Sequence, residues 1–432
     1  MNSPDVPDKP FPQFQVLRDN TERKGKLAIR PALIKILAKM ARRLSEGRIQ
    51  NGTPRTLWAS TPILTLPLLA RCDRLLGLRS SSLVFRTYYI TRSFDINLIL
   101  FEGVFRLTRS RACLGLFRWI VFAWALLRFD TFNYFYDRGL LLSDKRFGIN
   151  PEELELLHQS GKRLYTYAYG ADVRTRKATL QLPSPNLCQG CPEPGKFCIC
   201  TDELHASAFS RLSGRTNAQI AMGDMVAYVP ECRDMHYWPI DPDKFEARPP
   251  TFRAGDTLRV AHAPNHGHFK GTSLLRDAIN RLTAEGEKIE LVFVQGVSNK
   301  KVIELFGTAH IVADQFVSGF HGYTALEAMA MAKPVLCFLR NDQMMVDPAT
   351  CPIINTRPED IYAVLKKCLR SEIDLAALGR NGRRYVEEHY SLRAVAARLG
   401  RLYVETANYP DDLNQKLRTR IDDLEQGRAP QR

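Results

Sequence analysis

A turn in the last third of the chain has the residue types of an anion-binding site. The segment VSGFHGYTALEAMAMAKPVLCF (317–338) places two glycines before an apolar helical pattern, then breaks at Lys-Pro into an apolar strand pattern. Gly319 and Gly322 free the loop backbone. The amides of Gly322, Tyr323 and Thr324 are expected to point out of the helix start, where the helix dipole favours a phosphate. Glycine is also common in ordinary strand-to-helix turns, so the pattern alone leaves both interpretations open.

One carboxylate stands inside this apolar helical pattern. Glu327 follows the turn closely and is surrounded by Ala, Leu and Met. A buried carboxylate is costly unless a partner donates to it, and the two hydroxyls of a ribose would do so. The alternative explanation is that the helix dipole stabilises an acidic residue near a helix N-terminus.

A second loop has the composition of a diphosphate site. In HAPNHGHFKGT (262–272), Lys270 precedes Gly271 and Thr272 at the start of a helical pattern. A lysine at such a place can act as a point charge on phosphate, although the glycine spacing is not that of a P-loop. The loop also holds three histidines without an accompanying Asp or Cys, so a metal site is the less favoured interpretation: His262, His266 and His268.

A third stretch, YGADVRTRK (169–177), follows a strand pattern in the first half of the chain. Residues that follow a strand end face the cleft of a parallel α/β unit. Asp172 and Arg174 are therefore expected to hold an acceptor or to close the donor site. The alternative is a surface salt bridge of little energetic value.

Four of the ten cysteines are clustered in CQGCPEPGKFCIC. Cys-x2-Cys followed closely by two more thiols predicts a structural zinc site. Its expected ligands are Cys188, Cys191, Cys198 and Cys200. The closing Cys-x-Cys spacing is unusual for zinc, so free thiols and an iron–sulfur cluster stay open as alternatives.

The hydrophobic pattern predicts the scaffold that positions these loops. Strand and helix patterns alternate from about residue 53, pause in a proline-rich connector and restart at LRVAHA. A chain of 432 residues is long enough for two domains, so we predict an α/β fold of two facing doubly wound units. The expected divisions are 1–50 (basic arm and amphipathic helix), 51–235 (acceptor side, with a Cys-rich insertion at 185–202), 236–254 (hinge), 255–405 (donor side) and 406–432 (charged tail). The tail is expected to fray from about residue 410.

Positive charge is concentrated toward the N-terminus. The net charge is +15, and residues 1–128 hold 22 Lys or Arg against 8 Asp or Glu, an excess of 14. Such a field suits an anionic membrane surface or nucleic acid. Nucleic acid is disfavoured because the sequence contains no recognised binding module.

A basic amphipathic helix is predicted at 27–47. Its apolar face consists of Leu33, Ile36, Leu37, Met40 and Leu44. Two interpretations remain, a helix docked on the first domain and a helix that lies in a membrane interface.

The chain is not expected to span a membrane. The longest apolar run, 112–127, is interrupted by Arg118 and is shorter than a spanning helix needs, so a buried helix is predicted. The N-terminus lacks the pattern of a secretory signal. We expect a cytoplasmic protein, at most peripheral on the inner face of the membrane.

Together these stretches resemble the C-terminal domain of GT-B glycosyltransferases, in particular retaining enzymes of glycosyltransferase family 4, over about residues 255–400. KGTSLLRDAINRL is similar to the Lys-Gly helix of that family, GYTALEAMAMAKPVLCF to its glutamate helix and following strand, and NGRRYVEEHYSLRAVAARL to its closing helices. The first half resembles the family through YGADVRTR and the proline-rich hinge.

The resemblance implies a nucleotide-diphospho-sugar donor on the second domain, an acceptor on the first and no catalytic metal. Lys270 would contact the diphosphate, Glu327 the ribose, and the amides of the helix start the phosphates. The remaining expected donor contacts are Asn265, Gly271, Thr272 and Arg174. The implied reaction transfers a sugar, with retained configuration, to a polysaccharide or lipid-linked acceptor of the cell envelope.

Three departures from the family pattern concern catalysis. The family spaces two glutamates eight apart, whereas Gly319 stands eight residues before the helix glutamate. A loop arginine of the family would fall near Pro264 or Asn265, and Tyr169 stands where many members have histidine. His321 is the expected substitute for one missing contact. The alternatives are a catalytically degenerate nucleotide-sugar-binding partner and, less favoured, a GT-B epimerase.

Overall fold

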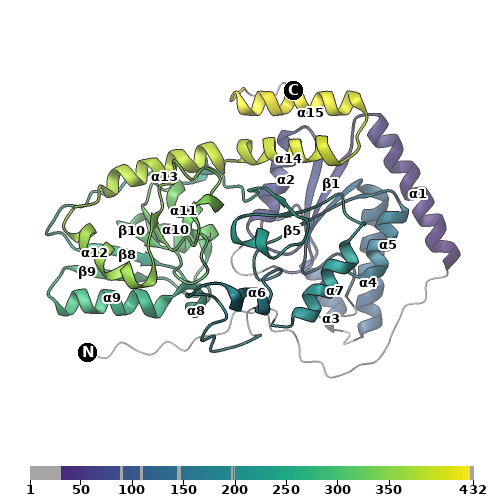
Figure 1. Ribbon diagram of the computed structural model, residues 1–432. Helices are drawn as coiled ribbons and strands as arrows, with labels where there is room; N and C mark the ends of the chain where they lie inside the picture. Colours follow the sequence, from purple (N-terminus) through teal and green to yellow (C-terminus); the bar gives the residue numbers. More distant parts are fainter. Residues whose placement is uncertain are drawn as a thin grey trace.

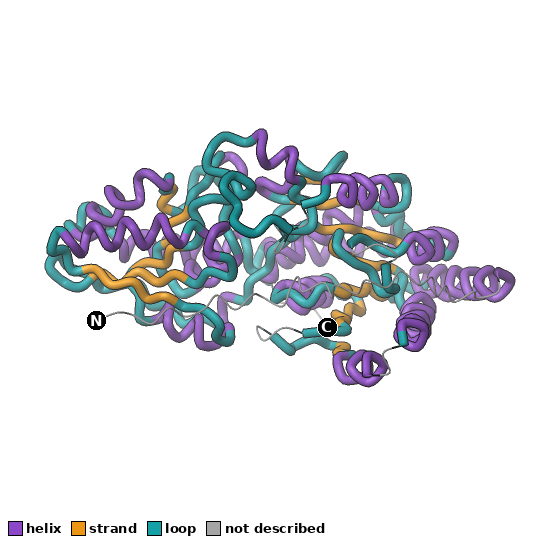
Figure 2. Tube along the Cα trace, turned by 90° about the horizontal axis from the view of Figure 1, so that it is seen from below, coloured by secondary structure: helices purple, strands orange, loops and turns teal. Residues whose placement is uncertain are grey.

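The protein consists of two parallel β-sheets that stand side by side, each flanked by helices (Figure 1). The computed structural model describes residues 31–87, 91–107, 110–143, 147–195, 198 and 200–428. Seen from below, the strands fall into two groups with helices around them (Figure 2). The predicted α/β architecture of two doubly wound units is therefore confirmed.

The first sheet has seven strands in the order β3-β2-β1-β4-β5-β6-β7, with parallel pairing throughout. Its central strands are buried over almost their whole length, as expected when helices cover both faces of a parallel sheet. The strands are β1 (Arg55–Ser60), β2 (Arg79–Val84), β3 (Ile96–Asn97), β4 (Thr131–Phe135), β5 (Arg163–Tyr167), β6 (Ala218–Ala221) and β7 (Arg233–Asp234).

Helices connect the strands of this first unit. Side-chain caps define two of their starts, since Ser110 accepts from the Cys113 amide at α4 and Asn150 accepts from the Glu152 amide at α5. The helices are α1 (Pro31–Gln50), α2 (Thr65–Leu75), α3 (Ile99–Leu107), α4 (Arg111–Arg128), α5 (Pro151–Gln159), α6 (Arg176–Gln181), α7 (Asp202–Leu212) and the 3-10 helix η1 (Gly223–Ala227).

The longest apolar run of the sequence lies in α4. The predicted buried helix is confirmed for one face only, because Leu116, Ile120 and Trp124 on the other face are exposed. Arg118, which interrupts the run, is buried and bonds to Glu102 of α3. None of the helices in the described ranges is long and apolar enough to cross a membrane.

The second sheet has five parallel strands in the order β12-β11-β10-β8-β9. Its strands are β8 (Leu258–His262), β9 (Ile289–Phe293), β10 (Ile311–Ala313), β11 (Val335–Cys337) and β12 (Ile354–Asn355). Its helices are α8 (Gly267–Lys270), α9 (Thr272–Ala284), α10 (Asn299–Gly307), α11 (Tyr323–Ala330), α12 (Ile361–Leu369) and α13 (Leu375–His389). The order of elements matches the predicted restart of the strand and helix pattern.

The last two helices return to the first unit. α14 (Leu392–Thr406) packs on α2 and α15 (Asp411–Glu425), and all three lie over the first sheet in Figure 1. The Tyr403 hydroxyl donates to the buried Asp73 carboxylate at 3.0 Å. The expectation that residues after about 410 fray is wrong, because α15 buries an apolar stripe: Leu413, Leu417, Ile421 and Leu424.

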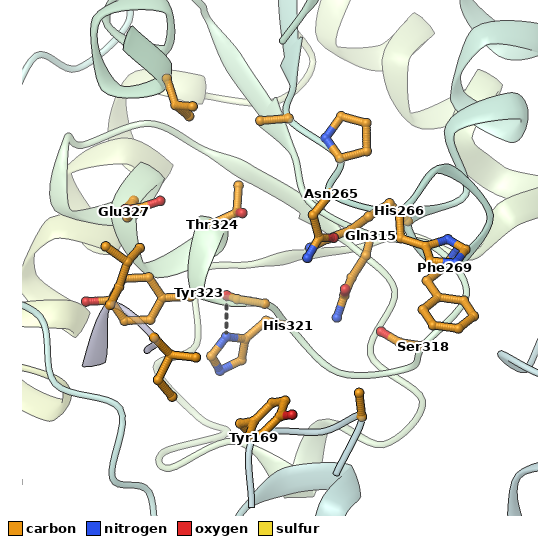
Figure 3. Close-up of a pocket in the computed structure, with 18 of the residues that line it drawn as sticks. Tyr169, Asn265, His266, Phe269, Gln315, Ser318, His321, Tyr323, Thr324 and Glu327 are labelled. Carbon is orange, nitrogen blue, oxygen red and sulfur yellow. Dashed lines mark hydrogen bonds between the residues drawn. The ribbon is translucent and has the colours of Figure 1, made fainter. Parts of the chain in front are cut away.

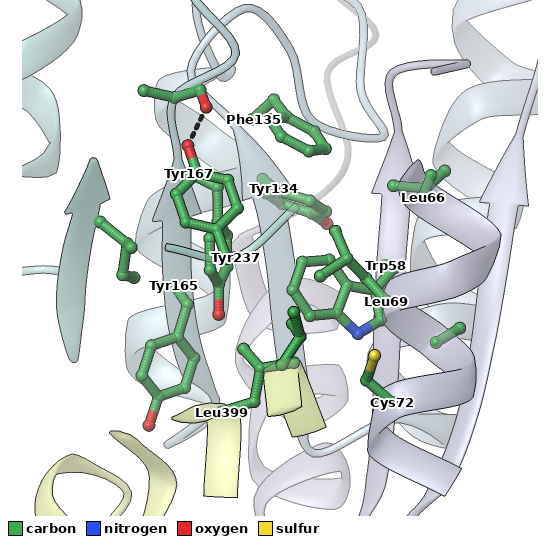
Figure 4. Packing of buried hydrophobic residues seen from close by; sticks show 14 of the residues in the cluster. Trp58, Leu66, Leu69, Cys72, Tyr134, Phe135, Tyr165, Tyr167, Tyr237 and Leu399 are labelled. Atoms are coloured by element: carbon green, nitrogen blue, oxygen red, sulfur yellow. Dashed lines mark hydrogen bonds between the residues drawn. The ribbon is translucent and has the colours of Figure 1, made fainter. Parts of the chain in front are cut away.

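Aromatic side chains fill the core beside the first sheet (Figure 4). The ring centroids of Trp58 on β1 and Tyr167 on β5 lie 4.8 Å apart, and that of Tyr237 lies 5.1 Å from Tyr167. The Tyr237 hydroxyl also donates to the Ala168 carbonyl. The proline-rich connector is thereby fixed to the end of β5, next to the loop that begins at Tyr169.

Candidate functional site

A cavity of about 400 Å³ lies between the two units. The first unit contributes the loops that follow β1 and β5, and the second unit contributes the loops that follow β8, β9 and β10 together with the start of α11. All of these loops leave the carboxyl ends of parallel strands, which is where doubly wound folds bind ligands. Figure 3 shows Asn265, Gln315, His321 and Thr324 around the open space.

The structure gathers most of the predicted site residues in the wall of this cavity. The wall includes Arg174, Asn265, Lys270, His321, Gly322, Tyr323, Thr324, Glu327 and two of the four clustered cysteines, Cys188 and Cys198. Five predicted residues lie outside the wall: Asp172, Gly271, Thr272, Cys191 and Cys200.

Lys270 is ion-paired at the base of the cavity. Its Nζ lies 2.6 Å from Oδ1 of Asp314, the residue that follows β10. Both residues are buried, Lys270 at 8% and Asp314 at 1% exposure. The pair keeps a charged ammonium in a largely dehydrated wall, and two of its three hydrogens remain for other acceptors.

The start of α11 is joined to this ion pair. The Gly322 amide donates to Oδ2 of Asp314 at 2.5 Å, so one carboxylate holds both the lysine and the helix start. A Cβ at position 322 would lie only 2.8 Å from the Lys270 Nζ and 3.0 Å from Oδ1 of Asp314, so a side chain here would displace the ion pair. Tyr323 and Thr324, the first residues of α11, present the next two amides of the helix start.

Glu327 lies one turn further along α11 and is 5% exposed. Its Oε1 accepts a hydrogen bond of 2.7 Å from Nδ2 of Asn299, at the start of α10. Burial raises the pKa of Glu327 to about 7. The side chain therefore titrates near neutrality while it faces the cavity.

His321 is held rigidly beside the α11 start. Its Nδ1 donates to the Gly322 carbonyl at 3.1 Å, and its Nε2 lies 3.3 Å from the Tyr390 hydroxyl. Burial lowers the pKa of His321, so the ring is neutral at physiological pH. A neutral ring at this place can position a ligand or exchange a proton, and it adds no positive charge for a phosphate.

Gly271 and Thr272 support the lysine loop from behind. Gly271 has a φ of 68°, the left-handed region, between α8 and α9, and a Cβ there would meet the Phe316 Cβ at 3.0 Å. The Thr272 hydroxyl lies 2.9 Å from Nε2 of His262, whose Nδ1 donates to the Ala313 carbonyl. These two predicted donor contacts thus fix the end of β8 and the course of the loop.

Asp172 lies beneath the loop that it was expected to expose. It is fully buried, and its Oδ1 accepts from the amides of Tyr169 and Gly170 at 2.8 and 2.9 Å. Burial raises the pKa of Asp172 to about 8. This carboxyl therefore shapes the loop from below.

Arg174 reaches the cavity from the same loop. Its guanidinium donates to Asp224 of η1 through two contacts, Nε to Oδ2 at 2.7 Å and Nη2 to Oδ1 at 2.9 Å. This fork-to-carboxylate geometry fixes the side chain in one orientation. Arg174 is thus both a cavity residue and the link between the β5 loop and η1.

The two units also touch beside the cavity. A Cβ at Gly223 would lie 2.5 Å from the Phe320 ring, and Gly223 has a φ of 57°. Arg340 of the second unit donates to the Pro183 carbonyl of the first at 2.7 Å. The loop that carries His321 is therefore braced against η1.

The described residues do not show the predicted zinc site. Cys198 and Cys200 have their sulfurs 3.4 Å apart, yet no group of three or more His, Cys, Asp or Glu within the described ranges could hold a metal ion. The Cys188 and Cys198 thiols line the cavity, with Cys188 beside Thr179. A zinc site on the four clustered cysteines therefore stays a prediction.

Sequence reasoning missed three partners of the predicted residues: Asp314, Asn299 and Asp224. Asp314 had a usable signal, because an acid directly after a short apolar strand lies at the ligand-binding edge of a parallel sheet. Asn299 and Asp224 had none. Asn299 begins α10 and Asp224 lies in η1, and both acquire their partners only through the fold.

Two comparisons with known proteins returned nothing: no family model matches the chain, and no curated protein matches it. Solved structures do match. HepE from Anabaena, crystallised with UDP and glucose, has a TM-score of 0.50 and 10% identity, over 82% of this chain and 100% of that one. Sucrose-phosphate synthase from Thermosynechococcus elongatus has a TM-score of 0.52 and 13% identity, over 82% of this chain and 98% of that one. At such identities the likeness concerns the fold alone, and the predicted GT-B fold is confirmed.

Proposed function

We propose that the protein is a glycosyltransferase that moves a sugar from a nucleotide-diphosphate donor, bound mainly by the second unit, to an acceptor on the first. The observation that carries this proposal is the arrangement of Lys270, the α11 start and Glu327 along one wall of the cavity. A cation, helix amides and a carboxylate match, in that order, the charges and hydroxyls of a nucleotide diphosphate.

The diphosphate would bind between Lys270 and the first amides of α11. In the reaction, the bond between the anomeric carbon and the diphosphate oxygen breaks, an acceptor hydroxyl forms the new bond, and its proton passes to the departing diphosphate. Negative charge grows on the departing diphosphate. Donors fixed beforehand around that charge stabilise it without reorganisation, which is the largest catalytic effect available in such a site.

The ribose would bind at Glu327. An ionised carboxylate accepts from both ribose hydroxyls, and the Asn299 amide holds the carboxylate in place. The pKa of about 7 means that this acceptor is ionised in roughly half of the molecules at neutral pH.

Uridine nucleotides are the first donors to test, because HepE, which shares the fold, was crystallised with UDP and glucose. The acceptor would approach from the loop after β1, where Pro62, Ile63 and Leu64 line the cavity opposite the donor wall. We further propose a retaining reaction and a polysaccharide or lipid-linked acceptor, on the basis of the sequence resemblance.

A transfer assay tests the proposal. The purified full chain is incubated with UDP-, GDP- and ADP-sugars and a panel of oligosaccharide and lipid-linked acceptors, and nucleotide release is measured with and without acceptor. Acceptor-dependent release that Lys270→Met abolishes is the expected result. Nucleotide binding without turnover on any acceptor would favour the non-catalytic binding partner instead.

A further inference from the structure

Exposed large apolar side chains are concentrated on three neighbouring helices of the first unit. In the described ranges, twelve of the fourteen such side chains lie on α1, α3 and α4. The two others are Leu180 and Phe293. Because α4 packs against both α1 and α3, we treat the twelve residues as one surface and call it the apolar face. Figure 1 shows α1 and α4 on the side of the first unit that faces away from the second unit, and α3 at the lower edge of the first unit.

The burial pattern of α3 is the reverse of that of an ordinary surface helix. Its one buried residue is its only acid, Glu102, which is 1% exposed. Its apolar side chains Leu100, Val104 and Leu107 are 80%, 62% and 83% exposed. A helix at a water-covered surface has the opposite pattern, so the orientation of α3 indicates that an apolar medium covers it.

Polar anchors hold α3 in this orientation. Arg118 donates to Oε2 of Glu102 at 2.8 Å, and Arg106 donates to Oε1 at 2.9 Å. The Phe105 ring also stacks on Phe117 of α4, with centroids 4.7 Å apart. The exposed apolar residues take no part in these contacts, so their presence is not explained by the stability of the fold.

α1 contributes a second apolar stripe. It buries Ala38, Ala41 and Ile49, and it packs on α4 and α5. Ile36 and Met40 on its other side are 63% and 45% exposed. The helix is therefore docked on the first unit and still presents apolar residues to its surroundings. Docking on the first unit and an apolar side open to a membrane interface, which the sequence left as alternatives, are compatible in this helix.

Charge around the apolar face is positive. Lys35, Lys39 and Arg43 on α1, and Arg111 and Arg128 at the ends of α4, are exposed. Across the three helices the one exposed acid is Glu46. This distribution is complementary to an anionic surface, and it disfavours a second copy of the same face because two basic rims repel each other.

We propose that the apolar face docks on an anionic lipid bilayer. The apolar side chains of α3, α4 and α1 enter the headgroup region of one leaflet, and the surrounding lysines and arginines contact lipid phosphates. The surface is separate from the cavity, so this proposal goes beyond the proposed function and stands or falls independently of it.

Vesicle co-sedimentation tests the proposal with two pairs of variants. The full chain is mixed with vesicles of phosphatidylcholine alone or of equal parts phosphatidylcholine and phosphatidylglycerol. Leu100→Ser/Val104→Ser/Leu107→Ser is compared with the control Leu180→Ser. Lys35→Glu/Lys39→Glu is compared with Lys416→Glu/Arg418→Glu, which reverses two exposed charges on α15.

We expect the wild type to bind anionic vesicles at least about tenfold more strongly than neutral ones, with binding weakened by salt. The serine variant and the α1 charge variant should each lose at least about tenfold, and both controls should bind like the wild type. If the serine variant melts at a lower temperature than the wild type, its loss of binding no longer tests the proposal. The comparison of Lys35→Glu/Lys39→Glu with Lys416→Glu/Arg418→Glu then tests it instead.

Three results would overturn the proposal. One is absence of wild-type binding to anionic vesicles, and another is equal loss in a variant and its control. The third is a dimer in lipid-free solution that the serine variant converts to a monomer, because the apolar face would then join two copies of the chain.

Discussion

The two walls of the cavity each present one cation paired with a buried aspartate, and the two pairs are built differently. Lys270 meets Asp314 through one contact of 2.6 Å, whereas Arg174 meets Asp224 through two contacts of 2.7 and 2.9 Å. A lysine with one contact keeps two hydrogens for a ligand, whereas the arginine fork is engaged along one edge. The comparison indicates that Lys270 serves the ligand and that Arg174 chiefly fixes its loop.

Asp314 adds a second difference. It also accepts from the Gly322 amide, so a diphosphate that binds to the lysine must share the α11 start with a carboxylate. That carboxylate opposes the negative charge of the ligand while it keeps the lysine in place. The donor wall is therefore preorganised at some cost in affinity.

The largest effect is expected from Lys270→Met. Loss of a charge-assisted contact to the diphosphate, about 2–3 kcal/mol, should weaken UDP-glucose binding about 100-fold in calorimetric titration. The variant also leaves the Asp314 carboxylate buried without its partner, which lowers the free energy of unfolding.

The matched control for this variant is Lys270→Met/Asp314→Asn, which removes both charges. It should regain stability in urea unfolding and still bind UDP-glucose weakly. Binding as tight as in the wild type would show that Lys270 does not contact the diphosphate.

Arg174→Met should affect stability more than binding. It leaves Asp224, which is 6% exposed, without its cation and should lower the free energy of unfolding by about 2 kcal/mol. UDP-glucose affinity should change by less than about threefold. If affinity instead fell as far as in the Lys270 variant, the two pairs would not differ in role.

Glu327 should make both stability and donor binding depend on pH. Burial raises its pKa from 4.5 to about 7, so the folded protein keeps a proton that the unfolded chain releases. Its contribution to stability is complete below about pH 4.5 and is lost as pH rises through about 7, by at most about 3 kcal/mol. Glu327→Gln should reduce this slope in urea unfolding, and the part that comes from the buried Asp172 carboxyl should remain.

Donor binding should become stronger as the pH rises, whereas the stability falls. UDP-glucose affinity should rise by up to about tenfold from about pH 6 to about pH 8, because the ionised carboxylate is the stronger acceptor for ribose hydroxyls. Glu327→Gln should bind more weakly at the upper pH and show no step. A step of equal size in the variant would assign the titration to another group.

Tyr323→Phe should have the smallest effect. The hydroxyl of Tyr323 donates to the Pro239 carbonyl at 2.9 Å and ties α11 to the connector, so its loss should cost about 1 kcal/mol of stability. Tyr362→Phe, whose hydroxyl bonds to Glu285 on the surface, is the control. Equal melting temperatures for the two variants would show that the Tyr323 hydroxyl does not stabilise the contact between α11 and the connector.

Sequence periodicity predicted both sheets because parallel strands buried on two faces leave a strong apolar signal. It also predicted that Lys270 and Glu327 lie at one cavity, because loops at the carboxyl ends of neighbouring parallel strands lie at the same edge of the sheet. The periodicity did not indicate which residue pairs with Lys270 or with Glu327. Asp314 lies 44 residues from Lys270, and Asn299 lies 28 residues from Glu327, so only the fold pairs them.

Other features were not predicted, and the reasons are local. The cysteine spacing carries no information about how the thiols point, and the structure turns Cys188 toward the cavity. The charged composition after residue 410 concealed an apolar stripe of helical period in α15. The reversed orientation of α3 depends on Glu102 and Arg118, whose pairing the apolar run around Arg118 did not indicate.

The most direct test of the donor site is calorimetric titration of the full chain with UDP, GDP and ADP, alongside Lys270→Met and Glu327→Gln. Tight binding of one nucleotide, weakened by both substitutions, is the predicted result. If the intact, folded protein binds none of the three, the cavity between the two units is not a nucleotide-sugar site.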